Sequence, residues 1–209
     1  TTDAYDALKH YEIDDVNLME MEFALPPSGR EWYGESFRIT RTRDFNFSFT
    51  NRIETEPVSI TSDLAVRVFS AGAASMSVNG QLLGNVATQA TTTYIYTDYA
   101  KRLSFPCVPT LYSGQDINTQ ISLNHSSSAA EMWLNYLTAQ ARCQLRFSTG
   151  QLPFRDFQTV GQGSATYTIN NANNVTVWDV TYPNGIQRVA TGSGTLSFGA
   201  DATVLREFV

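Results

Sequence analysis

The sequence predicts an all-β protein: an antiparallel β-sandwich of the jelly-roll kind, with little helix. Several segments alternate apolar and polar residues with a period of two, as strands that cover one side of a core do. Of the 209 residues 12% are aromatic and 16% charged, against about 25% charged in typical domains. Gly, Asn and Pro break the segments at short intervals, and the helical segments of a βαβ series are missing. Sandwiches of this length commonly form one domain, so residues 1–209 are expected to be a single β-sandwich domain.

The longest alternation covers residues 137–147. Leu, Ala, Cys and Phe side chains share one parity there, and Thr, Gln and Arg side chains share the other. The preceding residues 129–134 are rich in good helix formers. A helix would scatter Arg142 and Arg146 around its surface, whereas a strand keeps them on one face. We therefore predict a strand through this region, with Cys143 on its apolar face.

Shorter elements follow from the same reasoning. Phe45, Phe47 and Phe49 alternate with polar residues and predict a half-buried strand. Asn79-Gly80 stands between two apolar segments and predicts a hairpin with a type I′ turn, because both central residues need positive φ. One short helix is expected near residues 3–10. The further predicted strands are 64–69, 93–96, 120–123, 165–169, 175–180, 187–190 and 195–198.

Charge and hydropathy argue against two classes of partner. The net charge is −6 and no basic cluster is present, so nucleic acid is not expected as a partner. No run approaches the ~18 apolar residues of a membrane span. The chain begins at Thr1 without Met, and residues 205–209 alternate like the start of a strand without a stop signal. We expect this chain to be a fragment excised from a longer protein, whose sequence continues after residue 209.

No catalytic residue is predicted. Cys107 lies between two prolines, and His10 and His125 are the only histidines; neither has a local motif that would place it beside a thiol, which a nucleophilic Cys needs. Cys107 and Cys143 suit a disulfide of an exported protein, worth about 3 to 4 kcal/mol. Cys143 also suits a buried thiol. The sequence leaves these two alternatives open.

Metal and sugar sites are weighed in the same way. Asp14 and Asp15, with Glu12, Glu20 and Glu22 nearby, lack the alternating ligands and central Gly of a calcium loop. They are interpreted as a solvated acidic edge beside buried Ile13, Val16 and Leu18, and no metal or other cofactor is expected.

The tryptophans offer a carbohydrate-binding surface, or they fill the core. The residues concerned are Trp32 with Tyr33, Trp133 and Trp178. Core positions are the commoner fate of Trp in a β protein. Trp178 in particular is predicted to be a core anchor.

Four segments together resemble the region that precedes the peptidase domain in Type IX secretion system sortases of the PorU type, which are gingipain-like cysteine peptidases. The family patterns are G-x-x-W-[FY]-G-E-x-F, W-L-D-Y-I with a downstream Arg, G-Q-L-x-F-R and V-W-D-V-T-x-P. Here they correspond to residues 29–37, 133–136 with Arg142, 150–155 and 177–183, followed by 206–209. Asn135 stands where the second pattern has Asp, so no role of that carboxylate is carried over. Residues 1–28 contribute little to the resemblance.

The resemblance implies a supporting role. Such sortases cleave the C-terminal signal of secreted cargo with a Cys and a His and pass the cargo to cell-surface lipopolysaccharide. The dyad lies downstream of the matching region, so this chain would be a non-catalytic module at the cell surface or outer membrane. It would pack on the peptidase domain of the same chain or help it dock, with outer-membrane secretion components and cargo as further partners. Glu35 and Asp179 lie inside the motifs and are interpreted as structural hydrogen-bonding residues.

Two other functions remain open at this stage. A carbohydrate-binding or adhesin module would present exposed Trp or Tyr. A viral or phage jelly-roll protein would show similar Thr- and Asn-rich strands and would assemble. The sequence alone does not choose among the three.

Overall fold

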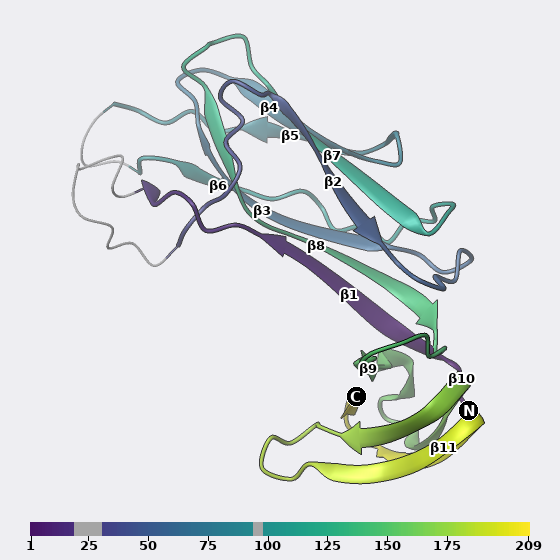
Figure 1. The fold of residues 1–209 in the computed structure, drawn as a ribbon. Coiled ribbons are helices and arrows are strands. Elements are labelled where there is room, and N and C mark those ends of the chain that lie inside the picture. Colours follow the sequence, from purple (N-terminus) through teal and green to yellow (C-terminus); the bar gives the residue numbers. More distant parts are fainter. Residues whose placement is uncertain (19–30, 94–97) are drawn as a thin grey trace. The chain divides into compact units, whose positions relative to one another are not determined.

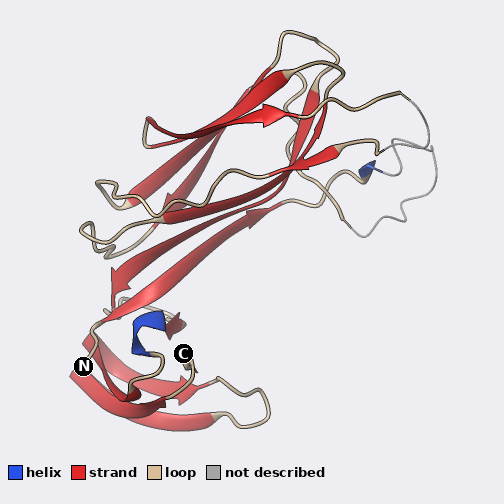
Figure 2. Ribbon diagram, turned by 180° about the vertical axis from the view of Figure 1, so that it is seen from behind, coloured by secondary structure: helices blue, strands red, loops and turns tan. Residues whose placement is uncertain are grey.

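A computed structural model describes residues 1–18, 31–93 and 98–209, and these residues are almost entirely strand and loop (Figure 1; Figure 2). The predicted strand at 93–96 lies largely outside the described residues, as do Glu20, Glu22, Gly29 and Arg30. Within the described ranges the one helical element of three residues is the 3-10 turn η1, Phe157–Thr159. The strands are β1 (Ala4–Glu12), β2 (Thr42–Ser48), β3 (Ser59–Arg67), β4 (Gly72–Val78), β5 (Gln81–Thr88), β6 (Lys101–Leu103), β7 (Asp116–Asn124), β8 (Glu131–Gln144), β9 (Phe154–Arg155), β10 (Gly163–Asp179), β11 (Gln187–Ala202) and β12 (Glu207–Phe208).

Two compact units divide the chain. The jelly-roll unit consists of Leu8–Ser48 and Val58–Ala139, and the C-terminal unit consists of Thr1–Ala7, Phe49–Pro57 and Gln140–Val209. The chain crosses between them inside β1 and β8, and again after β2 and before β3. The expectation that residues 1–209 behave as one domain stays a prediction.

The strand order of the jelly-roll unit is that of a jelly roll. One sheet has the order β1-β8-β3-β6 and the other has β2-β7-β4-β5, and they form two layers in Figure 1. The first strand therefore neighbours the eighth, the second the seventh, the third the sixth and the fourth the fifth. This is one long hairpin of four strand pairs rolled into two sheets, the jelly-roll arrangement. The predicted antiparallel β-sandwich is confirmed.

Alternating side chains explain how the two sheets bury a core. Phe45 and Phe47 on β2 and Leu137 and Ala139 on β8 are all at most 5% exposed. Asn79 and Gly80 join β4 to β5 with φ of 48° and 79°, as the type I′ turn requires. The strand predicted over 137–147 begins earlier, at Glu131, and its regular part ends at Gln144. The choice of strand over helix for the preceding residues is confirmed as well.

The C-terminal unit is one sheet of order β11-β10-β12-β9. Four aromatic side chains form the centre of its core, with ring centroids 5.0–6.4 Å apart. They are Phe154, Tyr167, Phe198 and Phe208. The predicted C-terminal strand is therefore present, and Phe208 is 1% exposed because these rings cover it.

Two sequence predictions about the elements are wrong. Residues 3–10 form no helix but most of strand β1. Their backbone finds partners across the fold: the N–H of Leu145 donates to the Asp3 carbonyl at 2.6 Å, and that of Thr2 donates to Thr166 at 2.8 Å. Tertiary pairing of this kind outweighs weak local helix propensity.

The four strands predicted between 165 and 198 are two long strands. Residues 165–169 and 175–180 both belong to β10 except for Val180, and the other two predicted strands both belong to β11. The Asn-rich stretch between the first two was interpreted as a break. Instead Asn171 and Asn174 adopt φ of 57° and 51° at register shifts on either side of Ala172. Asn tolerates this conformation, so bulges absorb the irregularity and pairing continues.

Candidate functional site

The candidate site lies where three chain segments meet in the C-terminal unit. Strand β12 is central, with β10 on one side and β9 on the other. Phe208 lies opposite Asp179 of β10 and opposite Phe154 of β9. Beyond it, Val209 and Trp178 exchange two backbone hydrogen bonds of 3.0 and 2.9 Å. The last three family-like segments, 150–155, 177–183 and 206–209, thus pair with one another.

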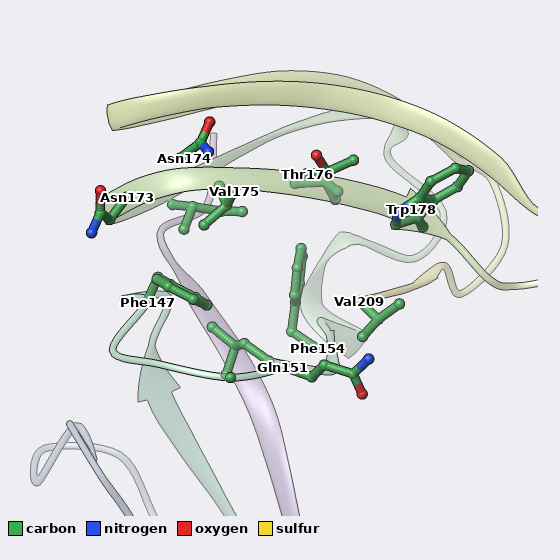
Figure 3. Close-up of a pocket in the computed structure, with 13 residues that line it drawn as sticks. Phe147, Gln151, Phe154, Asn173, Asn174, Val175, Thr176, Trp178 and Val209 are labelled. Atoms are coloured by element: carbon green, nitrogen blue, oxygen red, sulfur yellow. The ribbon is translucent and has the colours of Figure 1, made fainter.

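A pocket of about 270 Å³ opens directly beyond Val209, between β10 and the loop before β9 (Figure 3). Its lining combines apolar side chains with the amides of Gln151, Asn173 and Asn174 and the hydroxyl of Thr176. No described residue that lines it has an ionisable side chain. It offers apolar contacts and neutral hydrogen bonds, the chemistry of binding rather than of acid–base or nucleophilic catalysis. The lining residues are Phe147, Gly150, Gln151, Leu152, Phe154, Ile169, Asn173, Asn174, Val175, Thr176, Val177, Trp178 and Val209.

Trp178 is not the predicted core anchor. Its side chain is 42% exposed, whereas Val177 is 2% exposed. Successive residues of a strand face opposite sides, so the inward face of β10 carries Val177 and the outward face carries Trp178. Local parity was predicted correctly, but the wrong face was chosen. In Figure 3 the Trp178 ring lies on β10, across the pocket from Phe147 and Gln151.

The other tryptophans divide between core and partial burial. Trp133 is 2% exposed and packs with Tyr33 and Ala65, as the core interpretation predicts. Trp32 is half-buried. The three tryptophans therefore do not share one character, and Trp178 alone combines high exposure with a place beside the pocket.

A buried ion cluster supports the C-terminal unit. Arg142 Nη1 lies 2.6 Å from Asp156 Oδ1 and 3.5 Å from Asp6 Oδ1. Thr2 Oγ1 donates to Asp156 Oδ2 at 2.7 Å, and the backbone N–H of Phe157 donates to Asp6 at 2.7 Å. The two carboxylates thereby fix both the N-terminal segment and the turn η1. Asp156 caps that turn by accepting from the Gln158 N–H.

The two carboxyl groups of this cluster titrate in opposite directions. Burial raises the pKa of Asp6, and the hydrogen bond from Phe157 and the Arg142 charge only partly offset that effect. Burial also disfavours the charged form of Asp156, but the hydrogen bonds from Arg142, Thr2 and the Gln158 N–H outweigh it, so the pKa of Asp156 is lowered. Asp156 is the better hydrogen-bonded of the two carboxylates.

The cysteines and histidines occupy separate environments. Both cysteines are thiols; Cys107 is exposed and Cys143 is buried. Thr61 Oγ1 donates to Cys107 Sγ at 3.7 Å. Burial is the main cause that raises the pKa of Tyr5 to about 12, and the neighbouring Cys143 adds to the shift.

The two histidines have oxygen or backbone partners. His10 Nε2 lies 2.7 Å from Glu12 Oε2, and its ring stacks on Tyr136. His125 accepts at Nδ1 from the Ser127 N–H at 3.0 Å, and its Nε2 lies 3.1 Å from the Ser70 carbonyl oxygen. His10 therefore bonds within its own strand, whereas His125 links its loop to Ser70 in the loop after β3.

The acidic segment 12–15 is exposed, but one of its expected buried neighbours is not. Ile13 is 45% exposed, while Leu18 packs against the Trp133 cluster and Val16 pairs with Tyr33. Among the described residues no group of three or more His, Cys, Asp or Glu could hold a metal ion. Glu20 and Glu22 lie outside the described residues.

The first two family-like segments meet in the jelly-roll unit. Gly34 N–H donates to the Leu134 carbonyl at 2.7 Å, and Ser36 forms a bridge with Trp133. A Cβ on Gly34 would lie 2.8 Å from the Ile13 carbonyl oxygen, so only Gly fits there without movement. Glu35 accepts a hydrogen bond from the Tyr11 hydroxyl. These motif residues have structural partners.

Asn135 has a specific partner of its own. Its Nδ2 donates to Asp63 Oδ2 at 2.7 Å, and Arg102 Nε lies 2.5 Å from the other Asp63 oxygen. Asp63 is buried. An Asp at position 135 would place two carboxylates together, so the departure from the family pattern suits this site.

Sequence reasoning named parts of this site without recognising a pocket. The family-like segments 150–155, 177–183 and 206–209 contain several of the lining residues. Trp178 was given the wrong orientation, and Asp156 was not singled out. The Asn-rich stretch 170–174 was a further available signal, because Asn is enriched where φ is positive. The pocket itself arises from strand order, which a local pattern does not encode.

Comparison with solved structures identifies an extensive likeness to a secretion protein. Dimeric latent PorU from Porphyromonas gingivalis superposes with a TM-score of 0.80 at 20% identity, over 99% of this chain and 20% of that one. The resemblance inferred from the four segments is thus confirmed at the level of the fold. This chain spans about a fifth of the PorU chain. Neither a protein-family model nor a curated protein sequence matches.

Two further structures are much less similar. Insecticidal delta-endotoxin Cry8Ea1 from Bacillus thuringiensis gives a TM-score of 0.36 at 11% identity, over 51% of this chain and 19% of that one. Carbohydrate-binding module CBM36, in complex with calcium and xylotriose, gives a TM-score of 0.31 at 9% identity, over 46% of this chain and 70% of that one. Both TM-scores are too low to support a functional argument.

Proposed function

We propose that this chain is a non-catalytic β-sandwich module of a Type IX secretion sortase-like cysteine peptidase at the cell surface. It supports the peptidase domain of the same longer protein or helps it dock. The observation that carries the proposal is the likeness to PorU over 99% of the chain. The pairing of the family-like segments with one another supports it, because residues of these motifs form backbone and side-chain contacts within the fold.

The first test concerns the longer protein. We expect its gene to encode, after Val209, a gingipain-like domain containing a His and then a Cys. The longer protein should release the C-terminal signal from a cargo substrate, and a variant with its own downstream Cys replaced by Ala should not. An unrelated downstream sequence would contradict the proposal.

The second test concerns this chain alone. It should neither cleave nor transfer cargo, with or without reductant, because the described surroundings of Cys107, His10 and His125 give no activated nucleophile. Thiol-dependent turnover that is lost in Cys107→Ala and retained in Cys143→Ala would overturn the non-catalytic assignment.

Localisation and partners follow from the same proposal. The module is extracytoplasmic, at the cell surface or outer membrane, with secretion components and cargo as partners of the longer protein. No helix of the described residues is long and apolar enough to cross a membrane. Surface protease treatment of intact cells should remove an epitope placed on this module, whereas protection until lysis would contradict the location.

A second candidate, carbohydrate binding, is favoured by the exposure of Trp178 at 42% and Tyr182 at 58%. Exposed aromatic rings stack on sugar rings through their apolar faces. A glycan array followed by Trp fluorescence tests it: Trp178→Ala should abolish a true signal and Trp178→Phe should retain part of it. The jelly-roll order is shared by proteins of many functions and does not favour the viral alternative, which sedimentation would reveal through assembly.

We also propose that the two units unfold as one domain. The unit boundary falls inside two strands, β1 and β8, so melting one unit would break strands that the other uses. Fluorescence of single-Trp variants that retain Trp133 or Trp178 reports on each unit separately. Coincident transitions are expected, and two separated transitions would show independent domains.

A further inference from the structure

The pocket beside Val209 lies where the central strand β12 would continue if it were longer. Strand β12 comprises two residues, Glu207 and Phe208, yet it lies between a neighbour on each side. The pocket lies in line with it: one wall is the β10 backbone at 173–178 and the other is the loop 150–152. Val209 also lines it (Figure 3).

We propose that this pocket receives, as an added β-strand segment, the residues that follow Val209 in the longer protein. The inference rests on the proposed function, according to which the chain is part of a longer protein. The segment would extend β12 between β10 and the loop before β9. The occupant is identified by the register and the edge chemistry of the pocket.

The register defines which residues the segment would meet. Phe208 opposes Asp179 and Phe154, and antiparallel partners move in opposite directions along their strands. The first residue after Val209 would therefore lie between Val177 and Leu152. The second would lie between Thr176 and Gln151. All four are pocket-lining residues.

Backbone groups at the edge match an incoming strand. In β10 the N–H and C=O of Trp178 pair with Val209, and the Val180 N–H donates to the Glu207 carbonyl at 2.8 Å. Alternate residues of a strand direct these groups to the same edge, so those of Thr176 point into the pocket. Exposed strand edges of this kind template further pairing.

The ladder has a defined end. The Asn174 N–H donates instead to Ser193 Oγ at 2.8 Å, and a register shift separates Ala172 from Val175. Added pairing therefore stops at Thr176. The pocket has room for about one further pair of ladder hydrogen bonds, between Thr176 and the second residue after Val209.

The floor of the pocket selects the side chain of the first added residue. Alternate strand residues share a face, so this residue faces inward with Phe208, which is 1% exposed. Its neighbours there are Val177, 2% exposed, and the partly buried Leu152. An apolar side chain suits the first position, and the second position, beside Thr176 and Gln151, accepts a polar one.

The test compares the 209-residue chain with the same chain carrying the next four residues of the parent protein. Amide exchange of Thr176 should slow by about tenfold, the effect of one added hydrogen bond, and Tm should rise by about 2–4 °C. The matched control has Pro as the second added residue, which removes the N–H that would donate to the Thr176 carbonyl, so the rise in Tm should be smaller than with the native residues. Unchanged Thr176 exchange in the native extension would overturn the inference.

Designed extensions separate this inference from the proposed function. Val-Thr-Val-Thr after Val209 places Val inward at the first position, and Thr-Val-Thr-Val places Thr there. The first should give the higher Tm and the slower Thr176 exchange, whether or not a peptidase is encoded downstream. Equal values would contradict the extension of β12 into the pocket, and they would leave the sortase proposal unaffected.

One outcome would identify a different occupant. A synthetic peptide of the four native residues, added in trans, should slow Thr176 exchange more weakly than the covalent extension does. If a peptide of a secretion partner slowed it while the native extension had no effect, the edge would be a docking site for another protein and the proposed occupant would be wrong.

Discussion

The jelly-roll unit and the C-terminal unit pair their strands in different ways. In the jelly-roll unit the eight strands form four complete pairs divided between two sheets. In the C-terminal unit two strands of 17 and 16 residues form a long ribbon, while β9 and β12 have two residues each. The pocket lies beside those short strands. A sheet with a short central strand leaves backbone edge available for binding.

The cores of the two units differ as well. The jelly-roll core draws aliphatic and aromatic side chains from two facing sheets, whereas the C-terminal core centres on four aromatic rings and a buried ion cluster beside them. A single sheet has no second sheet to cover it, so rings and ion pairs take over part of that role. Substitutions should therefore act through cavities in one unit and through unpaired charge in the other.

The largest expected loss comes from the ion cluster. Arg142→Met leaves Asp156, whose side chain is 1% exposed, without its cation and should lower the free energy of unfolding by about 3–5 kcal/mol. Chemical denaturation measures this. Arg155→Met is the matched control, because its partner Glu207 is 47% exposed and surface pairs contribute about 0–1 kcal/mol. Equal losses would mean that Asp156 is solvated.

The same cluster predicts a pH dependence. The pKa of Asp156 is lower in the folded chain than in the unfolded chain, so the unfolded chain binds more protons and stability falls as pH drops through the range below about 4. The pKa of Asp6 is raised in the folded chain, so its effect on stability has the opposite sign. Asp6 stabilises the fold at low pH, and this stabilisation is lost as the pH rises through its folded-state pKa. Asp156→Asn should lose less stability on acidification than the wild type, and Asp6→Asn should lose more. Parallel pH profiles for all three proteins would contradict this assignment.

A similar loss is expected in the jelly-roll core. Trp133→Ala removes a side chain that is 2% exposed and should cost about 3–5 kcal/mol through lost burial and a cavity. The loss should appear in denaturation followed by circular dichroism. Trp133→Phe fills part of the space and should cost less; if the alanine variant kept wild-type stability, Trp133 would not be a core residue.

A smaller effect is expected at Asn135. Asn135→Asp replaces a hydrogen bond to buried Asp63 with a second carboxylate and should cost about 1–2 kcal/mol at neutral pH. The cost should shrink as the pH falls and one carboxyl binds a proton. Asn135→Ala, which removes the donor without adding charge, should show no such pH dependence. A pH-independent loss in the Asp variant would exclude charge repulsion.

The smallest effect separates the two tryptophans. Trp178→Ala should cost less than about 1 kcal/mol, the usual range for surface changes, because the ring is 42% exposed. Measured beside Trp133→Ala, it gives the sharpest contrast between a core and a surface Trp. A loss as large as that of Trp133→Ala would restore the core interpretation derived from the sequence.

Local sequence patterns were sufficient to predict the fold class and which residues of several strands share a face. The alternation over 137–147 predicted the buried face of β8, and Asn79-Gly80 predicted its hairpin, since strand period and turn sterics are local properties. The four family-like segments also identified the PorU-like fold.

Tertiary structure decided the rest. Parity places Val177 and Trp178 on opposite faces, but only the packing of Phe154, Tyr167 and Phe208 shows which face is inward. Residues 3–10 form most of β1 because they pair with segments distant in the sequence. The segments on either side of Asn171 and Asn174 form one strand, β10, because both pair with β11. The pocket depends on β12 inserting between β10 and β9, both of which lie far before it in the sequence. These outcomes depend on long-range partners, and a local pattern carries no information about which strands become neighbours.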